Sequence, residues 1–492
     1  MDSIKKLAGQ SAIYGLSSIV GRFLNYLLVP LHTNVFSQPG EYGVVTEFYA
    51  YISFLMIIYT YGLETSFFHF SRKYEGRSSV FSTIMGSLLI STLVFTAGVL
   101  FYSDDISHLI QYAGHPEYVQ IMALVIAFDA LTSVPFARLR HQAKARKFAV
   151  IKIVNIMVNI MLNLFFFLVL PYLAAGDTSL SAAADRLYDA ENRVVYVFIA
   201  NLAASAITFL LLIGEFRFSF SHFESSLLRE VILYSSPLLI AGLAGMVNET
   251  LDRVMIKYLV SDSSSALSQL GIYGACYKLS IIMTLFIQAF KYAAEPFFFS
   301  QFGKDDAKHT YVVVMKYFVL TCSLIFLVVM LYIDLFKYFI GPSYRSGLHI
   351  VPVLLIANMF LGIFFNLSMW YKMTGRTRFG ALFAIIGAVI TIAGNLYLIP
   401  RMGYEGAAWT TLVCYAVMMV ISYFAGMRYY PVDYKPLKLL GFIIFAVLMY
   451  QVSVWMNDYL NFDTIIRLLV NTVILFIFVG LVYRFDKLKE LR

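Results

Sequence analysis

The chain has 492 residues, of which 60% are hydrophobic and only 13% are charged, and its formal net charge is +8. Soluble domains carry roughly 25% charged residues, so this composition excludes an ordinary water-soluble protein. The mean hydropathy of +0.75 agrees. The basic residues stand in short clusters between apolar runs, which argues against a nucleic-acid-binding surface and for a chain that stays in a lipid bilayer.

Apolar runs long enough to cross a membrane follow one another along the whole sequence. A bilayer core of about 30 Å needs about 20 apolar residues in one helix. Fourteen such runs occur, approximately at residues 10–33, 44–68, 80–101, 118–138, 148–171, 194–214, 231–259, 270–293, 311–333, 348–370, 380–399, 405–426, 438–456 and 464–483. We therefore expect an all-α integral membrane protein with about 14 transmembrane helices. Arg22 and Asn25 interrupt the first run, so we expect it to remain as a membrane helix rather than a cleaved signal peptide.

The distribution of Lys and Arg between the runs predicts the orientation. If the N-terminus lies in the cytoplasm, the inside segments carry 25 basic residues and the outside loops carry 5. Cytoplasmic loops of membrane proteins are enriched in Lys and Arg. We therefore predict a multi-pass membrane protein with both termini in the cytoplasm.

The sequence resembles itself at an offset of 231 residues. Tyr42-Gly43 corresponds to Tyr273-Gly274, and Glu64 corresponds to Glu295. Lys147-Phe148 before the fifth run likewise matches Arg378-Phe379 before the eleventh. The repeat predicts two parallel six-helix lobes, at about 1–220 and 225–430, followed by two accessory helices within 431–492. Parallel repeats of this kind recur in transporters, where the substrate site lies between the halves.

Polar residues inside the runs are the candidates for a binding site, because a charge at the membrane centre costs roughly 2.5–3.5 kcal/mol on insertion scales. Such residues normally face a cavity or a partner. The candidate substrate-binding residues are Arg22, Asn25, Lys152, Asn155, Asn159, Asp252, Arg253, Lys257 and Lys278. The candidate carboxylates for ion coupling are Asp129, Glu249 and Asp252.

Other interpretations of these residues stay open. Glu249 and Arg253 are spaced as an i, i+4 pair that can neutralise itself. A stripe of asparagines, as in the fifth run, can also join helices. Arg22 has no acidic residue nearby in its own run, which favours a cavity for it. The three cysteines lie in apolar runs without metal or redox spacing, so we expect them to serve packing and expect no metal and no cofactor.

The chemistry of the candidate set points to a bulky substrate. Arginine binds phosphate through its planar donor fork, and asparagine both donates to and accepts from hydroxyl groups. This combination suits a molecule with phosphate at one end and hydroxylated groups at the other. No GxxxxGK[ST] motif is present, so we do not expect the chain to use ATP.

The segment Asn395 to Thr410, with Pro400, Gly403 and Gly406, resembles the junction of the eleventh and twelfth helices in bacterial polysaccharide (O-antigen type) flippases. The central Arg22 of the first run and the pair Asp252-Arg253 are also similar to that family. The group includes multidrug and toxin extrusion transporters and the lipid II flippase, with twelve to fourteen helices in two lobes.

This resemblance implies a flippase for an undecaprenyl-pyrophosphate-linked oligosaccharide, working by alternating access in the synthesis of lipopolysaccharide or another surface polysaccharide. It implies that Arg22 meets the pyrophosphate, and less directly that Lys152, Arg253, Lys257 and Lys278 do. The expected partners are the lipid-linked oligosaccharide and membrane lipids, with no nucleic acid and a monomeric chain. A polysaccharide polymerase or ligase remains open as a further partner.

Two alternatives remain. A cation-coupled multidrug exporter of the same fold would be expected to carry a carboxylate in the first helix, where this chain has Arg22. A membrane glycosyltransferase or polymerase needs positioned acids or bases, and the outer loops offer only Asp104-Asp105 and the stretch 185–191. We therefore expect a transporter rather than an enzyme, with the driving force open between protons, sodium, the membrane potential and downstream consumption.

Overall fold

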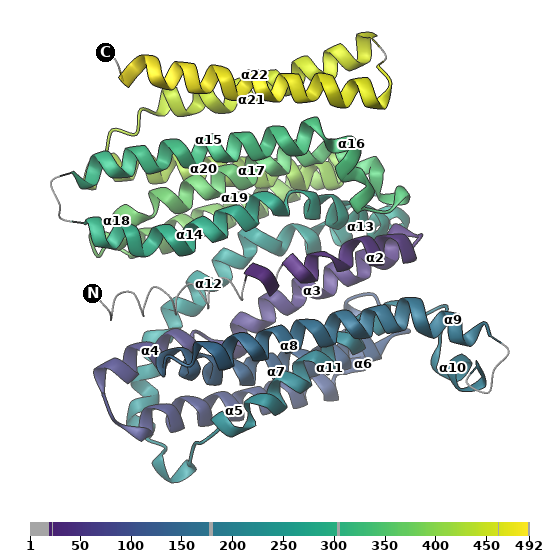
Figure 1. Ribbon diagram of the computed structural model, residues 1–492. Coiled ribbons are helices and arrows are strands. Elements are labelled where there is room, and N and C mark those ends of the chain that lie inside the picture. Colours follow the sequence, from purple (N-terminus) through teal and green to yellow (C-terminus); the bar gives the residue numbers. More distant parts are fainter. Residues whose placement is uncertain (1–18, 22, 177–180, 303–305, 461, 491–492) are drawn as a thin grey trace. The chain divides into compact units, whose positions relative to one another are not determined.

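The computed structural model describes residues 19–21, 23–176, 181–302, 306–460 and 462–490. The described part of the chain contains helices and no strands (Figure 1). The helices up to α12 are α2 (Leu28–Val35), α3 (Pro39–Thr60), α4 (Leu63–Lys73), α5 (Ser78–Phe101), α6 (Ser103–Leu109), α7 (Pro116–His141), α8 (Ala145–Leu164), η1 (Phe165–Val169), α9 (Leu170–Ala174), α10 (Ser181–Leu187), α11 (Val194–Leu212), η2 (Ile213–Glu215), η3 (Phe220–His222) and α12 (Ser225–Leu259).

The second half of the chain continues in the same way. Its helices are α13 (Ser263–Leu279), α14 (Ile281–Gln301), α15 (Ala307–Leu331), α16 (Ile333–Phe336), η4 (Lys337–Phe339), η5 (Pro342–Ile350), α17 (Val351–Leu367), α18 (Met369–Met373), α19 (Arg378–Met402), α20 (Tyr404–Tyr429), α21 (Pro436–Leu460) and α22 (Thr464–Glu490).

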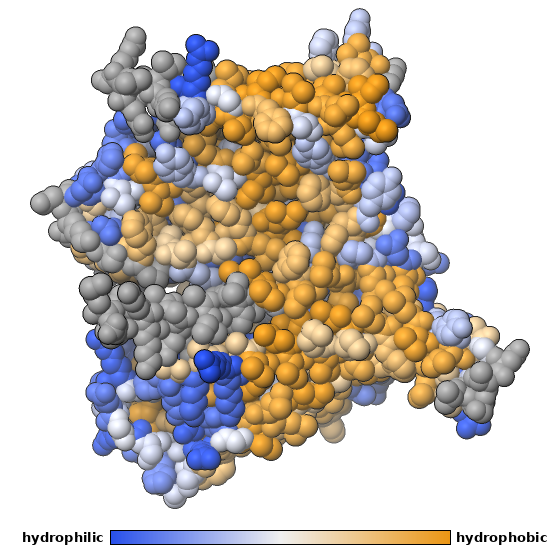
Figure 2. Space-filling view, viewed as in Figure 1, coloured by the Kyte–Doolittle hydropathy of each residue, from blue (hydrophilic) through white to orange (hydrophobic). Residues whose placement is uncertain are grey.

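The membrane character predicted from the sequence is confirmed. Within the described residues, 12 helices or helix runs are long and apolar enough to span a membrane, and the number is 13 if α13 and α14, which are bent by 49° at Ser280, count as one span. Each of these matches one of the predicted runs from 44–68 onward. Much of the first predicted run, 10–33, falls in residues 1–18 and 22, outside the described part. Apolar side chains cover much of the visible surface along the helices, as expected for lipid-facing walls (Figure 2).

The chain folds into two compact units. The first comprises residues 1–36 and 40–254, and the second comprises residues 37–39 and 255–492. The division falls within α12, later than the lobe boundary near 220 that the repeat predicts. The six-and-six lobes and the accessory segment 431–492 stay predictions.

The first unit is built around α7. This helix packs against α4, α5, α8 and α11. A buried apolar cluster that includes Phe67 of α4, Met85 of α5 and Val134 of α7 packs these three helices together. Since α7, α8 and α11 pack against one another, polar side chains on their facing sides are brought into a common space inside the bundle.

In the second unit, α17 packs against α15 and α20, and α19 packs against α20. The two C-terminal helices α21 and α22 lie against α15. Polar contacts help to hold α22: Arg467 lies 2.9 Å from a carboxylate oxygen of Asp334, and the amide of Asn471 donates to the carbonyl of Leu331 at 2.6 Å. The apolar helices are thereby joined in a defined register.

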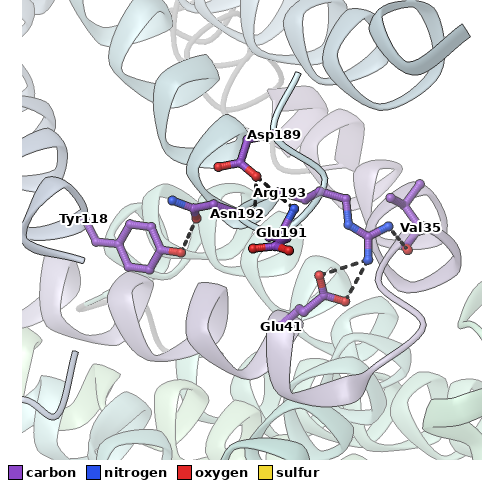
Figure 3. Close-up of polar contacts among 7 residues, drawn as sticks. All are labelled: Val35, Glu41, Tyr118, Asp189, Glu191, Asn192 and Arg193. Atoms are coloured by element: carbon purple, nitrogen blue, oxygen red, sulfur yellow. Dashed lines mark hydrogen bonds and ion pairs between the residues drawn. The ribbon is translucent and has the colours of Figure 1, made fainter. Parts of the chain in front are cut away.

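A loop before α11 joins three helices at one end of the first unit (Figure 3). The guanidinium of Arg193 donates to both carboxylate oxygens of Glu41, at 3.1 and 3.2 Å, and to the carbonyl of Val35 at 3.1 Å. Beside it, Tyr118 of α7 donates to the side chain of Asn192. Arg193 therefore satisfies a carbonyl at the end of α2 and pairs with an acid in the first turn of α3.

We expect Arg193→Met to lower the stability of the folded protein by about 1–3 kcal/mol, because the carbonyl of Val35 and the carboxylate of Glu41 lose a charged donor. Thermal unfolding of the purified protein in detergent measures this effect. Arg186→Met is the matched control, since Arg186 is an exposed residue of α10. Equal unfolding temperatures for the two variants would show that the Arg193 contacts contribute nothing.

Candidate functional site

A polar cavity of about 370 Å³ lies inside the first unit. Three residues predicted from the sequence line it: Asp129 on α7, and Lys152 and Asn155 on α8. The complete lining set is Met56, Glu64, Asp129, Thr132, Ser133, Phe136, Arg140, Phe148, Lys152, Asn155, Asn201, Ser205 and Thr208. The cavity is therefore built from α3, α4, α7, α8 and α11.

Four of the lining side chains are ionisable, two acidic and two basic. Glu64 forms an ion pair with Arg140 at the end of α7. The ammonium of Lys152 lies 4.3 Å from the centre of the Phe136 ring, and Asp129 lines the same cavity. Because opposite charges inside a membrane protein compensate one another, the cavity holds charged groups without a formal net charge.

The turn between α3 and α4 places Glu64 in this cluster. Gly62 has a φ of 75°, in the left-handed region that glycine adopts without strain. A Cβ atom at this position would lie 3.2 Å from the Cβ of Leu238 on α12. The turn thus needs glycine both for its backbone angle and for the close approach of α12, and α4 then packs against α7 with Glu64 facing Arg140.

Neutral polar groups form the rest of the wall. Asn155 donates to the hydroxyl oxygen of Thr208 at 2.8 Å, and Asn201 donates to the hydroxyl of Tyr49 at 2.9 Å. The hydroxyl of Ser133 donates to the carbonyl of Ala130 at 2.6 Å. These bonds hold the side chains of the wall in place.

The asparagines that form a stripe along α8 have two different kinds of surroundings. Asn155 lines the cavity, whereas Asn159 donates to the side chain of Asn25 at 3.3 Å. One turn further along, Asn163 donates to the carbonyl of Asn159, and its side-chain oxygen lies 2.7 Å from Nε2 of the buried His32 on α2. Asn159 and Asn163 therefore join α8 to the helical residues just before α2 and to α2 itself. This is the helix-contact interpretation that the sequence analysis left open for the asparagines of the fifth run.

The candidate residues of α12 lie outside this cavity. Asp252 is buried and accepts a hydrogen bond from the backbone N–H of Arg253 at 2.9 Å. The guanidinium of Arg253 donates to the backbone carbonyl of Glu249 at 2.9 Å. Lys257 is buried, with its ammonium 5.3 Å from the centre of the Tyr258 ring.

The last two candidate residues from the sequence are Lys278 and Arg22. Lys278 is half-buried at the end of α13, in the second unit. Arg22 lies outside the described residues. The structure thus brings Asp129, Lys152 and Asn155 together around one cavity and does not add the other candidates to it.

The second unit repeats the ion pair of the first. Glu295, the repeat equivalent of Glu64, lies 2.8 Å from the ammonium of Lys372, as Glu64 pairs with Arg140. Ala143 and Gly375 each follow the cation by three residues and have φ of 56° and 70°. The two pairs therefore occupy equivalent points of the predicted sequence repeat.

The polar cavity is not repeated in the same way. In the register of the pair Arg140 and Lys372, Asp129 corresponds to Leu361. In the register of Lys147 and Arg378, Lys152 corresponds to the buried Phe383. A duplicated scaffold thus carries polar side chains at these positions in the first unit and apolar side chains in the second, which marks the cavity of the first unit as the more specialised feature.

Several lining residues were not among the candidates predicted from the sequence. Asn201, Ser205 and Thr208 on α11 are spaced i, i+4, i+7, so they share one helix face. That spacing was a usable signal in the sequence. Arg140 was also not among the candidates, because its pairing with Glu64 depends on the packing of α4 against α7.

The fold is similar to that of several solved transporters. The lipid II flippase MurJ in an inward closed conformation superposes with a TM-score of 0.69 at 13% identity, covering 95% of this chain and 98% of that chain. A multidrug resistance MATE family transporter of the MOP superfamily, inward-facing, superposes with a TM-score of 0.64 at 14% identity, covering 86% of this chain and 95% of that chain. An outward-facing structure of such a transporter has a TM-score of 0.57 at 13% identity, with 86% and 96% covered.

Identity this low establishes a common fold and nothing finer. Comparison with curated protein sequences finds no match. The profile of one family, described as polysaccharide biosynthesis protein, matches residues 7–302, which is more than half of the chain. The chain therefore belongs to the polysaccharide biosynthesis protein family.

Proposed function

We propose that this protein is a flippase that moves an undecaprenyl-pyrophosphate-linked oligosaccharide from the inner to the outer leaflet of a bacterial cytoplasmic membrane. The observation that carries the proposal is the polar cavity of about 370 Å³ among membrane-spanning helices, in a member of the polysaccharide biosynthesis family. Intramembrane charge is costly and marks substrate or ion pathways. A protein with only a scaffolding role has no need of such a cavity.

The fold supports the same proposal. One of the similar solved structures is a lipid II flippase, and this chain matches nearly all of that structure's length. Parallel repeats allow alternating access, in which two halves rock around a substrate site. The substrate would enter from the inner leaflet and leave on the outer side, with both chain termini in the cytoplasm. The product would feed the synthesis of a surface polysaccharide such as lipopolysaccharide with O-antigen.

In this proposal cationic residues meet the pyrophosphate. They are Arg253, Lys257 and Lys278, which do not line the cavity, and Arg22, which is not among the described residues. The planar fork of arginine matches phosphate oxygens, and a buried ammonium adds a point charge. The carboxylates Asp129, Glu249 and Asp252 are the groups through which protons or sodium would be coupled to transport. No cofactor is needed for this mechanism.

A multidrug exporter of the same fold is the second candidate, because MATE family transporters are among the similar structures. Such an exporter moves its substrate out of the cell rather than between leaflets. An assay of dye efflux from vesicles distinguishes such an exporter from a lipid flippase.

The first experiment is a leaflet assay in proteoliposomes. Undecaprenyl pyrophosphate carrying an oligosaccharide is placed in both leaflets, and a glycan-cleaving enzyme is added outside. Without protein, about half of the glycan is cleaved; with an active flippase, we expect cleavage to approach completion because inner-leaflet lipid reaches the outside. A membrane-impermeant quencher of a labelled phospholipid controls for leaky vesicles. Cleavage that stops at the protein-free level with several glycans would reject the proposal, and dye efflux would then test the exporter.

The balance of charge in the cavity gives a second prediction. Asp129→Asn and Lys152→Gln each leave one uncompensated charge, whereas the double variant restores formal neutrality. In thermal unfolding we expect the double variant to be less destabilised than the sum of the single variants, with a coupling energy of roughly 0.5–3 kcal/mol.

The control cycle pairs Asp129→Asn with Arg193→Met, since Arg193 contacts the ends of α2 and α3 and does not line the cavity. We expect these two substitutions to add. If Asp129 and Lys152 also add, the two side chains do not compensate one another in the folded protein.

A further inference from the structure

The wall of the polar cavity offers acceptor oxygens as well as hydrogen-bond donors. The hydroxyl groups of Thr132, Ser133 and Thr208 each donate to a backbone carbonyl of their own helix, at 2.9, 2.6 and 2.8 Å. Their donors are therefore engaged, and lone pairs of the Thr132 and Ser133 oxygens remain to accept hydrogen bonds, whereas the Thr208 oxygen already accepts from Asn155. Asn155 and Asn201 each use one of two amide N–H groups on a protein oxygen, so each side chain also has a second N–H and a carbonyl oxygen.

The basic groups of the cavity already have acidic or aromatic neighbours. Arg140 pairs with Glu64 and lies 5.2 Å from the centre of the Phe68 ring. The ammonium of Lys152 lies over the Phe136 ring, and Asp129 lines the same cavity. A cluster of two acids and two bases offers no excess positive charge to a polyanion.

These two properties decide between the two ends of the proposed substrate. Pyrophosphate is multiply negative and acts mainly as an acceptor, so it binds where charged donors are in excess. A neutral sugar has hydroxyl groups that both donate and accept. Its donors match the acceptor oxygens of Ser133 and Asn155, and its C–H groups can pack on Phe136, Phe148 and Met56, which also line the cavity.

We propose that the cavity of the first unit binds neutral, hydroxylated sugar residues of the glycan, and that the pyrophosphate binds outside it. This inference rests on the proposed flippase function and deepens it by dividing the substrate between two sites. The volume of about 370 Å³ is near the lower end of the roughly 300–1,000 Å³ range of ligand pockets, so the cavity holds only a few sugar residues of a longer glycan.

A single reactive thiol tests this division. The three native cysteines, Cys276, Cys322 and Cys414, are buried and all belong to the second unit. Ser133→Cys therefore introduces a nearly isosteric thiol into the cavity wall, and Asn201→Cys is the second variant if the first does not fold. The rate of labelling by a small methanethiosulfonate reagent reports whether the cavity is occupied.

Two lipids are compared in the same proteoliposomes: undecaprenyl pyrophosphate carrying a neutral oligosaccharide, and undecaprenyl pyrophosphate without sugar. We expect the glycosylated lipid to slow labelling of the Ser133→Cys thiol at least fivefold and the sugar-free lipid to leave the rate unchanged. Ser78→Cys, at the exposed start of α5 and outside the cavity, is the control that should be labelled equally with either lipid.

The outcomes separate the two proposals. Protection by both lipids would place the pyrophosphate in the cavity and overturn the inference. Protection by neither lipid, in vesicles where the leaflet assay shows flipping, would also overturn it while the proposed function stands. If flipping and protection are both absent, the proposed function fails and the inference falls with it.

Discussion

The compensation of charge inside the first unit is the constraint on which the rest of this structure depends. Glu64, Asp129, Arg140 and Lys152 line one cavity among helices that are apolar enough to span a membrane. An isolated charge there would be expensive, whereas two acids with two bases can be accommodated. The packing of α4, α8 and α11 around α7 serves to bring these groups within reach of one another.

The two units share one kind of ion pair but differ at the positions of Asp129 and Lys152. Both units carry a Glu at the same point of the repeat, and each Glu pairs with a cation three residues before a residue of positive φ. In each unit, the acidic and the basic side chain of the pair neutralise one another. Only the first unit adds Asp129 and Lys152 at positions where the second unit has Leu361 and Phe383.

Hydrogen bonds between uncharged side chains engage the asparagines of α8 that do not line the cavity. On α8, Asn155 belongs to the cavity, while Asn159 and Asn163 bind Asn25 and His32. In membrane proteins, amide side chains readily serve as contacts between helices. A single stripe on one helix therefore has a part that lines the cavity and a part that joins helices. Which part a side chain belongs to depends on the neighbouring helix that it meets.

The sequence alone determined the membrane class, the spans from 44–68 onward and the residues that carry polar chemistry in the first unit. It could do so because apolar length and charge placement are local properties that the bilayer imposes on each helix separately. Asp129, Lys152 and Asn155 were identifiable for the same reason: each interrupts an apolar run.

Only the tertiary structure decided which of these residues share a cavity. The pairing of Glu64 with Arg140 joins positions 76 residues apart through the turn at Gly62. The contribution of Asn201, Ser205 and Thr208 requires that α11 lies against α7 and α8. Helix periodicity tells which side chains share a face, but it does not tell which helix that face will meet, because the partner is chosen by packing between segments distant in the chain.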